Sequence, residues 1–151
     1  MTRWSMVIDL DKCVACQGCS IACRFENNTP AAKPNEALAG RTIRWNDVYP
    51  LPVNATEDTG EYPHVETRYM TRPCMHCENP PCIKVCPVQA TYKNEEGIVL
   101  VDYDRCIGCR MCTVACPYAV RYFNWYPPEW PEELKAHLNP EPEVQPRPSR
   151  R

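Results

Sequence analysis

The residues best suited to chemistry in this sequence are its 12 cysteines, which fall into three closely spaced groups. The third group has the pattern Cys-x2-Cys-x2-Cys-x3-Cys-Pro and runs from Cys106 to Pro117. This spacing is typical of thiolates that bind a [4Fe–4S] cluster. Two-residue gaps let one tight loop direct three thiolates at one cluster, and the three-residue gap begins a helical turn that carries the fourth sulfur away. Because that fourth cysteine usually binds a neighbouring cluster, the group predicts a partner group.

Two other groups are candidates for that partner, and in the second of them a proline again follows the last cysteine. They are Cys13, Cys16, Cys19 and Cys23, and Cys74, Cys77, Cys82 and Cys86. A hairpin is predicted between the second and third groups, with strands at 90–92 and 98–101 around a turn that contains Gly97. The order of cysteine group, helical turn and hairpin indicates an internal duplication. We therefore expect two complete clusters with crossed ligands: Cys74, Cys77, Cys82 and Cys116 for one, and Cys106, Cys109, Cys112 and Cys86 for the other.

The first group predicts a third cluster with an incomplete ligand set. Cys23 follows a three-residue gap, so its local helix is expected to carry it toward a different cluster. Cys13, Cys16 and Cys19 are then left without a fourth thiolate from this sequence. All 12 cysteines are nevertheless predicted metal ligands.

The composition favours metal ligation as a source of folding energy. Leu, Ile, Val and Phe together number 26 of 151 residues, so an ordinary apolar core would be thin. Ligation energy stabilises the fold when the site does not exist in the unfolded chain. The formal net charge of -2 would become more negative with clusters bound, so no nucleic-acid surface is expected. The basic residues predicted to offset cluster charge are Lys12, Arg24, Arg72, Lys84, Arg105 and Arg110.

Zinc and disulfides are the alternatives for closely spaced cysteines. The amino terminus has no apolar stretch of signal-peptide length and no apolar run approaches about 18 residues, so neither export by a leader nor a membrane span is predicted. A disulfide scaffold is then disfavoured, because such scaffolds belong to oxidising compartments. Zinc is the main alternative, since paired Cys-x2-Cys units also build zinc sites. Four cysteines in each group favour iron–sulfur clusters over zinc.

The remaining predicted elements are short. Strands are expected at 4–10, 41–49, 65–70 and 118–123, and helices at 16–24 and 131–138. The strands at 41–49 and 65–70 would pair around the polar loop 50–63, and 31–40 is a linker with weak helical character. Seven prolines after residue 126 predict a tail that is extended or disordered outside its helix.

Three stretches carry a resemblance to a known family. IDLDKC, PCMHCENPPCIKVCP and DYDRCIGCRMCTVACPYAVRYFNW are similar to the iron–sulfur electron-transfer subunits of molybdopterin oxidoreductases. That group contains the small subunits of DMSO, polysulfide and thiosulfate reductases and of membrane-bound sulfite dehydrogenase. The resemblance covers residues 4 to about 126. It implies an α+β fold of tandem ferredoxin-like lobes, a first lobe at about 1–70 and a dicluster lobe at about 71–126, followed by the proline-rich tail 127–151.

The resemblance also implies a function. Electrons would pass through [4Fe–4S] clusters between a molybdopterin-containing catalytic subunit and a polytopic membrane anchor that reacts with quinone. The chain would have no catalytic site of its own, and it would be a peripheral subunit on the cytoplasmic face, or on the periplasmic face by co-export with a partner. The family has a fourth cysteine group, which supplies the missing ligand of the third cluster. The sequence has no such group, which leaves three alternatives: a labile or three-iron cluster, a cluster completed by another chain or a non-cysteine ligand, or a fragment. Of these we expect a fragment.

A freestanding ferredoxin-like carrier is the alternative function, with a structural zinc protein third. The loop 30–63 and the tail favour a subunit, since a mobile carrier needs neither. His76, inside the second group, is expected either to donate a hydrogen bond to a cluster sulfur or to face solvent.

Overall fold

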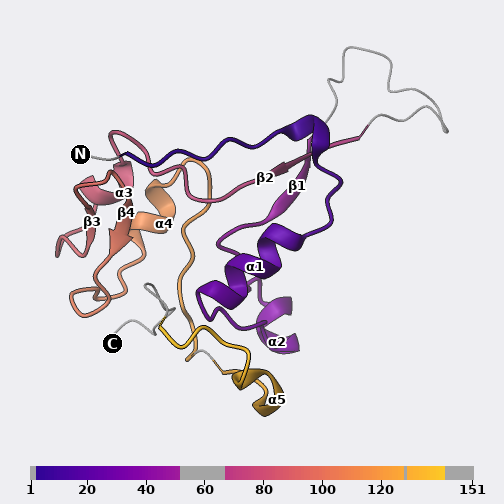
Figure 1. The fold of residues 1–151 in the computed structure, drawn as a ribbon. Helices are drawn as coiled ribbons and strands as arrows, with labels where there is room; N and C mark the ends of the chain where they lie inside the picture. The colour runs from indigo at the N-terminus through magenta and orange to yellow at the C-terminus, as the bar shows by residue number, and fades with distance from the viewer. Residues whose placement is uncertain (1–2, 52–66, 128, 142–151) are drawn as a thin grey trace.

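A computed structural model describes residues 3–51, 67–127 and 129–141, and its helices and strands are short (Figure 1). The helical elements are the 3-10 helix η1 (Leu10–Lys12), α1 (Gly18–Glu26), α2 (Pro34–Leu38), α3 (Pro81–Lys84), α4 (Met111–Ala115) and α5 (Glu132–Lys135). The strands are β1 (Val48–Leu51), β2 (Arg68–Thr71), β3 (Thr91–Lys93) and β4 (Val99–Val101). They form two separate antiparallel pairs, which is compatible with the predicted α+β class.

The hairpin between the second and third cysteine groups is confirmed. β3 and β4 pair with Tyr92 opposite Leu100. The side chain of Asn94 accepts a hydrogen bond of 2.7 Å from the N–H of Ile98, and Gly97 has a φ of 86° in the turn. In Figure 1 this hairpin lies beside α3 and α4, the helices that carry cysteines of the two groups.

The second pair of strands is shorter than predicted. β1 begins only at Val48, opposite Thr71, so the predicted strand at 41–49 is wrong for residues 41–47. The hydrogen bonding between the two segments continues one residue beyond the strands, where the N–H of Arg72 donates to the carbonyl of Asp47 at 2.8 Å. The predicted loop from residue 52 and the start of the partner strand at 65–66 lie outside the described residues.

Two predicted strands are not formed in the described part of the chain. The segment 4–9 is irregular and leads into η1, and the side chain of Val7 is 94% exposed. Its apolar alternation was a strand signal, but a strand needs a hydrogen-bonded neighbour. The return segment 118–123 is also irregular, since Ala119 adopts a left-handed φ of 52° that interrupts an extended path.

The amino-terminal stretch runs from the hairpin of β3 and β4 to the strand pair of β1 and β2. It begins beside the hairpin, where Arg3 forms an ion pair with Glu78, and it ends at η1 beside β2 (Figure 1). There Arg68 and Asp11 form an ion pair with a distance of 3.7 Å between their charged atoms.

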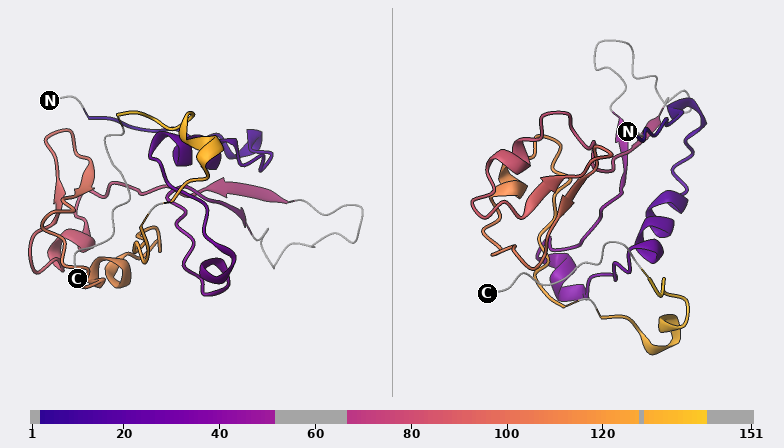
Figure 2. Two further views of the ribbon diagram at one scale, coloured as in Figure 1. Left: turned by 90° about the horizontal axis from the view of Figure 1, so that it is seen from below. Right: turned by 60° about the vertical axis from the view of Figure 1, so that its left-hand side comes forward.

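The carboxy-terminal strap, residues 129–141, packs on the end of α1. The helix predicted at 131–138 is present as α5, although the packing was not anticipated. The rings of Trp130 and Phe25 lie 5.6 Å apart between centroids, and Asn28 and Asn139 exchange hydrogen bonds of 2.9 and 3.1 Å. In the right-hand view of Figure 2 the strap lies near the lower end of α1.

The apolar core is thin, as the composition predicted. Among the described residues, the buried apolar side chains are Ile43, Cys82, Ala90, Val99 and Val120. Most of them lie in or beside the segments that carry the second and third cysteine groups. Within the same described ranges, no helix combines the length and apolar character needed to cross a membrane.

Candidate metal centre

The three cysteine loops follow a similar backbone path. In each, the residue just before the second cysteine is left-handed: Ala15, His76 and Gly108 have φ angles of 55°, 41° and 73°. This conformation costs a residue with a Cβ roughly 1–2 kcal/mol, so only Gly108 adopts it freely. The repeat was not predicted, because glycine, its usual signal, occupies only one of the three positions.

The same loops place the third cysteine of each group in the first turn of a helix. Gln17 and Arg110, directly after the second cysteine, are left-handed N-caps of α1 and α4. In the longer second loop Pro81 begins α3 instead, a position that suits proline. The third cysteines set by these starts are Cys19, Cys82 and Cys112.

The last cysteines of the second and third groups are followed by matching turns. The N–H of Gln89 donates to the carbonyl of Cys86 at 3.2 Å, and that of Ala119 donates to Cys116 at 3.2 Å. Both donors are left-handed, with φ angles of 54° and 52°. Together with the loop geometry, these turns support the internal duplication that the sequence indicates.

Four cysteines from two groups line a small cavity. Its thiols belong to Cys74, Cys77, Cys82 and Cys116. The cavity has a volume of about 20 Å³, and its other lining residues include the apolar Pro80 and Val120. The structure thus brings together the set predicted for one crossed cluster.

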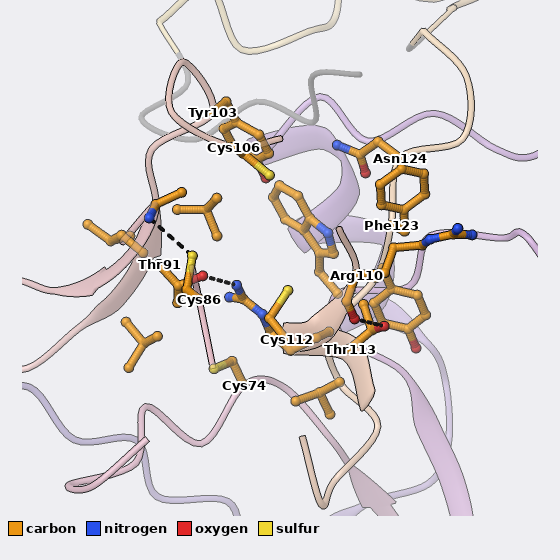
Figure 3. A pocket seen from close by; sticks show the side chains of 18 of the residues that line it. Cys74, Cys86, Thr91, Tyr103, Cys106, Arg110, Cys112, Thr113, Phe123 and Asn124 are labelled. Atoms are coloured by element: carbon orange, nitrogen blue, oxygen red, sulfur yellow. Dashed lines mark hydrogen bonds between the residues drawn. The ribbon is translucent and has the colours of Figure 1, made fainter. Parts of the chain in front are cut away.

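A larger cavity adjoins it, with a volume of about 380 Å³. Its lining includes the second predicted set, Cys86, Cys106, Cys109 and Cys112. Figure 3 shows Cys86, Cys106 and Cys112 around this cavity with Tyr103, and Cys74 at its lower edge. Cys23 from α1 also lines it, so the last cysteine of the first group lies with the third group.

The other cysteines of the first group lie apart from both cavities. Cys13 is half-buried, whereas Cys16 and Cys19 are exposed. The sulfur of Cys19 lies 3.5 Å from the hydroxyl oxygen of Thr71. Cys23 instead receives a hydrogen bond of 3.6 Å from the side-chain amide of Asn27, and burial raises the pKa of its thiol. The first group is therefore divided between two environments.

The thiols of the two cavities are spread around a space and do not converge on a point. Among the described residues, no three or more His, Cys, Asp or Glu side chains could hold a single metal ion. Structural zinc needs four ligands within about 2.0–2.3 Å of one ion. A [4Fe–4S] cluster instead binds its four thiolates through different iron atoms, so its ligands surround a cavity. The donor sets of these cavities fit such a cluster better than a single zinc ion.

Backbone N–H groups stabilise the thiolate form of Cys86. The N–H of Ala90 lies 3.2 Å from its sulfur. Burial tends to raise the pKa of this thiol, but the N–H groups of Thr91, Ala90 and Val88 lower it below its ordinary value. Iron binds the thiolate, so these donors favour the ligating form and would remain as donors to a bound cluster.

Arg121 is the charged residue that borders both cavities. Its guanidinium donates a hydrogen bond of 3.1 Å to the hydroxyl of Thr91 in β3, a residue labelled in Figure 3. Burial alone would lower its pKa, but the thiolates of Cys112, Cys82 and Cys74 outweigh burial and raise the pKa. The sequence predicted six other basic residues to offset cluster charge. It did not indicate Arg121, because this residue follows its nearest cysteine by five positions.

The ring of His76 is held by a hydrogen bond at the larger cavity. Its Nδ1 accepts a hydrogen bond of 2.9 Å from the N–H of Val99, so a neutral ring carries its proton on Nε2. Burial and the charge of Arg121 both lower its pKa, which favours the neutral ring. His76 is exposed but also lines the larger cavity, and donation of a hydrogen bond to a cluster sulfur stays a prediction.

Comparisons with known proteins support the binding of [4Fe–4S] clusters by this chain. Residues 65–130 match the family described as a 4Fe-4S dicluster domain, and residues 10–26 match a 4Fe-4S binding domain. The iron-sulfur cluster-binding subunit of menaquinone reductase from Nitratidesulfovibrio vulgaris is 47% identical over 146 residues, which cover 96% of this chain and 55% of that protein. A selenate reductase polypeptide from Mesobacillus selenatarsenatis is 49% identical over 123 residues, covering 82% and 37%. The iron-sulfur subunit of arsenate respiratory reductase from Shewanella sp. is 41% identical over 139 residues, covering 91% and 53%. The chain spans about half the length of these relatives, or less.

Proposed function

We propose that this chain, a homologue of the iron–sulfur subunits of reductases, is an electron-transfer subunit that relays electrons through [4Fe–4S] clusters. The relay would run between a molybdopterin-containing catalytic subunit and a polytopic, quinone-reactive membrane anchor. The chain would supply the relay and no catalytic site of its own.

One observation carries the proposal. The small cavity is lined by three cysteines of the second group and the last cysteine of the third, and the lining of the larger, adjoining cavity includes three cysteines of the third group and the last cysteine of the second, together with Cys23 and Cys74. Crossed ligands place two clusters side by side, and such proximity favours electron transfer between them. The proposed ligands are Cys74, Cys77, Cys82 and Cys116 for one cluster and Cys106, Cys109, Cys112 and Cys86 for the other.

The protein's part is to hold and tune these clusters. The [4Fe–4S] groups, when bound, supply one-electron redox chemistry. The N–H groups facing Cys86 and the proton on Nε2 of His76 supply hydrogen bonds, and the apolar wall around Val120 limits water. These features set cluster potentials in proteins of this kind.

A third cluster is proposed at Cys13, Cys16 and Cys19. The exposure of Cys16 and Cys19 supports a site that takes its remaining ligand from outside this cysteine group. Cys23 lies elsewhere, bordering the larger cavity, as expected if it belongs to a different cluster. We propose that the first lobe, about 1–70, holds this site and that the second lobe, about 71–126, holds the crossed pair.

The partners are proposed from the relatives. One of them is named as a subunit of menaquinone reductase, which supports a membrane-associated complex with a quinone-reactive anchor. We propose a peripheral location in such a complex, on the cytoplasmic face, with the periplasmic face as the alternative.

Isolation of the tagged chain under anaerobic conditions tests the proposal. The expected result is a stable complex that contains iron and acid-labile sulfide in equal amounts together with molybdenum. A cluster-loaded monomer that exchanges electrons freely with soluble donors would favour the freestanding carrier. Zinc without sulfide would contradict both.

A further inference from the structure

Arg121 lies where one charge can act on two clusters at once. It borders both the small cavity of Cys74, Cys77, Cys82 and Cys116 and the larger one that includes Cys112. Its neighbour Val120 is buried, 7% exposed, and lines both cavities. The guanidinium is held at its far end by the hydrogen bond to Thr91.

The groups that face this cation are thiolates of both proposed ligand sets. Cys112, whose thiolate has the largest effect on Arg121, belongs to one set, whereas Cys82 and Cys74 belong to the other. A guanidinium is charged at all ordinary pH values, so its effect does not depend on titration. Arg105 differs, because it is exposed and its charge is paired with Asp102 at 3.3 Å.

We propose that Arg121 is a shared potential-setting residue whose charge stabilises the reduced states of both clusters of the crossed pair. This inference rests on the proposed function. Each cluster takes up one electron on reduction and gains one negative charge, while no bond to the protein forms or breaks. A nearby cation stabilises the more negative state, so it raises the reduction potential. Because Cys112 is the thiolate that interacts most strongly with Arg121, its cluster is affected more strongly.

Redox titration of the full chain, reduced with dithionite and followed by electron paramagnetic resonance, tests this role. Arg121→Met should lower both potentials, with the larger change at the cluster bound by Cys106, Cys109 and Cys112. At a fixed potential, the reduced-to-oxidised ratio of that cluster should fall at least about tenfold, equivalent to about 59 mV for one electron. Arg121→Lys should restore most of the wild-type values because it keeps the charge.

Arg105→Met is the matched control. It removes the same charge beside Cys106, but from an exposed ion pair, so both potentials should change by clearly less than in Arg121→Met. Equal changes in Arg105→Met and Arg121→Met, or equal changes in Arg121→Lys and Arg121→Met, would overturn the proposal.

Iron content separates this inference from the proposed function. Wild-type protein without clusters would contradict the function itself. If Arg121→Met alone fails to retain both clusters, the Arg121→Lys variant shows whether charge or shape matters. Cluster assembly in Arg121→Lys with near-wild-type potentials supports a role for the charge. Failure of Arg121→Lys to assemble, or assembly with strongly lowered potentials, would show that the side chain acts by its shape.

Discussion

At the scale of single residues, identical thiols differ because their surroundings differ. Burial raises the pKa of Cys82 and Cys74, whereas backbone N–H groups lower the pKa of Cys86. A buried thiolate needs a compensating partner. Arg121 supplies a positive charge to the first two, and a bound cluster would supply iron to all three. Residue type alone indicates a ligand, but only the environment indicates how readily it is deprotonated.

The crossed ligand sets predict a specific defect in Cys116→Ser. The substitution should damage the cluster of Cys74, Cys77 and Cys82 and leave the cluster of the third group with all its thiolates. The reason is that Cys116 lines the small cavity with the second group. Iron content should fall by about one cluster per chain, and electron paramagnetic resonance should assign the loss.

Cys86→Ser is the reciprocal control for this experiment. It should damage the cluster of Cys106, Cys109 and Cys112 instead, because Cys86 lines the larger cavity. If each substitution damaged the cluster of its own group, the groups would be self-contained and the crossed arrangement would be wrong.

At the scale of secondary-structure elements, the sequence predicted the helices and turns that depend on nearby residues. The spacing of the first cysteine group predicted α1, and the turn with Gly97 predicted the hairpin of β3 and β4. The strands expected at 4–10 and 118–123 failed because pairing requires a neighbouring strand, which apolar alternation does not reveal. The left-handed residues were hidden for a related reason: at Ala15 and His76 the loop imposes a conformation that the residue type does not favour.

The packing of the carboxy-terminal strap on α1 gives a prediction at this scale. Trp130→Phe keeps an aromatic contact with Phe25 but removes the indole N–H, which donates to the carbonyl of Asn28 at 3.2 Å. It should weaken the strap by about 1 kcal/mol. Trp130→Ala also removes the ring contact, and the loss should be about 2 kcal/mol for this half-buried side chain.

Hydrogen exchange of the Asn139 amide measures this change. That N–H donates to the side chain of Asn28 at 3.1 Å and should exchange faster in the order wild type, Trp130→Phe, Trp130→Ala. Amides of the hairpin strand β4, which lies apart from the strap in Figure 1, are the internal control and should not change. Unchanged exchange at Asn139 in both variants would show that the strap does not depend on Trp130.

At the scale of the whole molecule, we propose that bound clusters take the place of an apolar core. The sequence located every cysteine group and the thin core, because both depend on composition and spacing. It did not predict that Arg121 and Cys23 line the larger cavity, since these positions depend on how distant segments pack. The candidate site was therefore predictable as a set of donors but not as an electrostatic environment.

Removal of iron should unfold most of the chain. Ligation energy is folding energy when the site is absent from the unfolded state, and few apolar side chains are buried in the described residues. Circular dichroism of chelated, anaerobic protein should show little ordered structure and no cooperative thermal transition. An iron-free chain with a cooperative melt would show that the apolar core suffices.

The most direct test of the adjacent cluster pair is electron paramagnetic resonance of the fully reduced protein, together with iron and sulfide quantitation. Two clusters held by crossed ligands lie close enough for their electron spins to interact. We predict equal iron and labile sulfide, at least two clusters per chain, and a spectrum broadened by spin coupling between the clusters. Partial reduction should give a simpler spectrum, because one cluster of the pair is then diamagnetic. A fully reduced protein that shows only isolated, uncoupled cluster signals, or a single cluster per chain, would contradict the account.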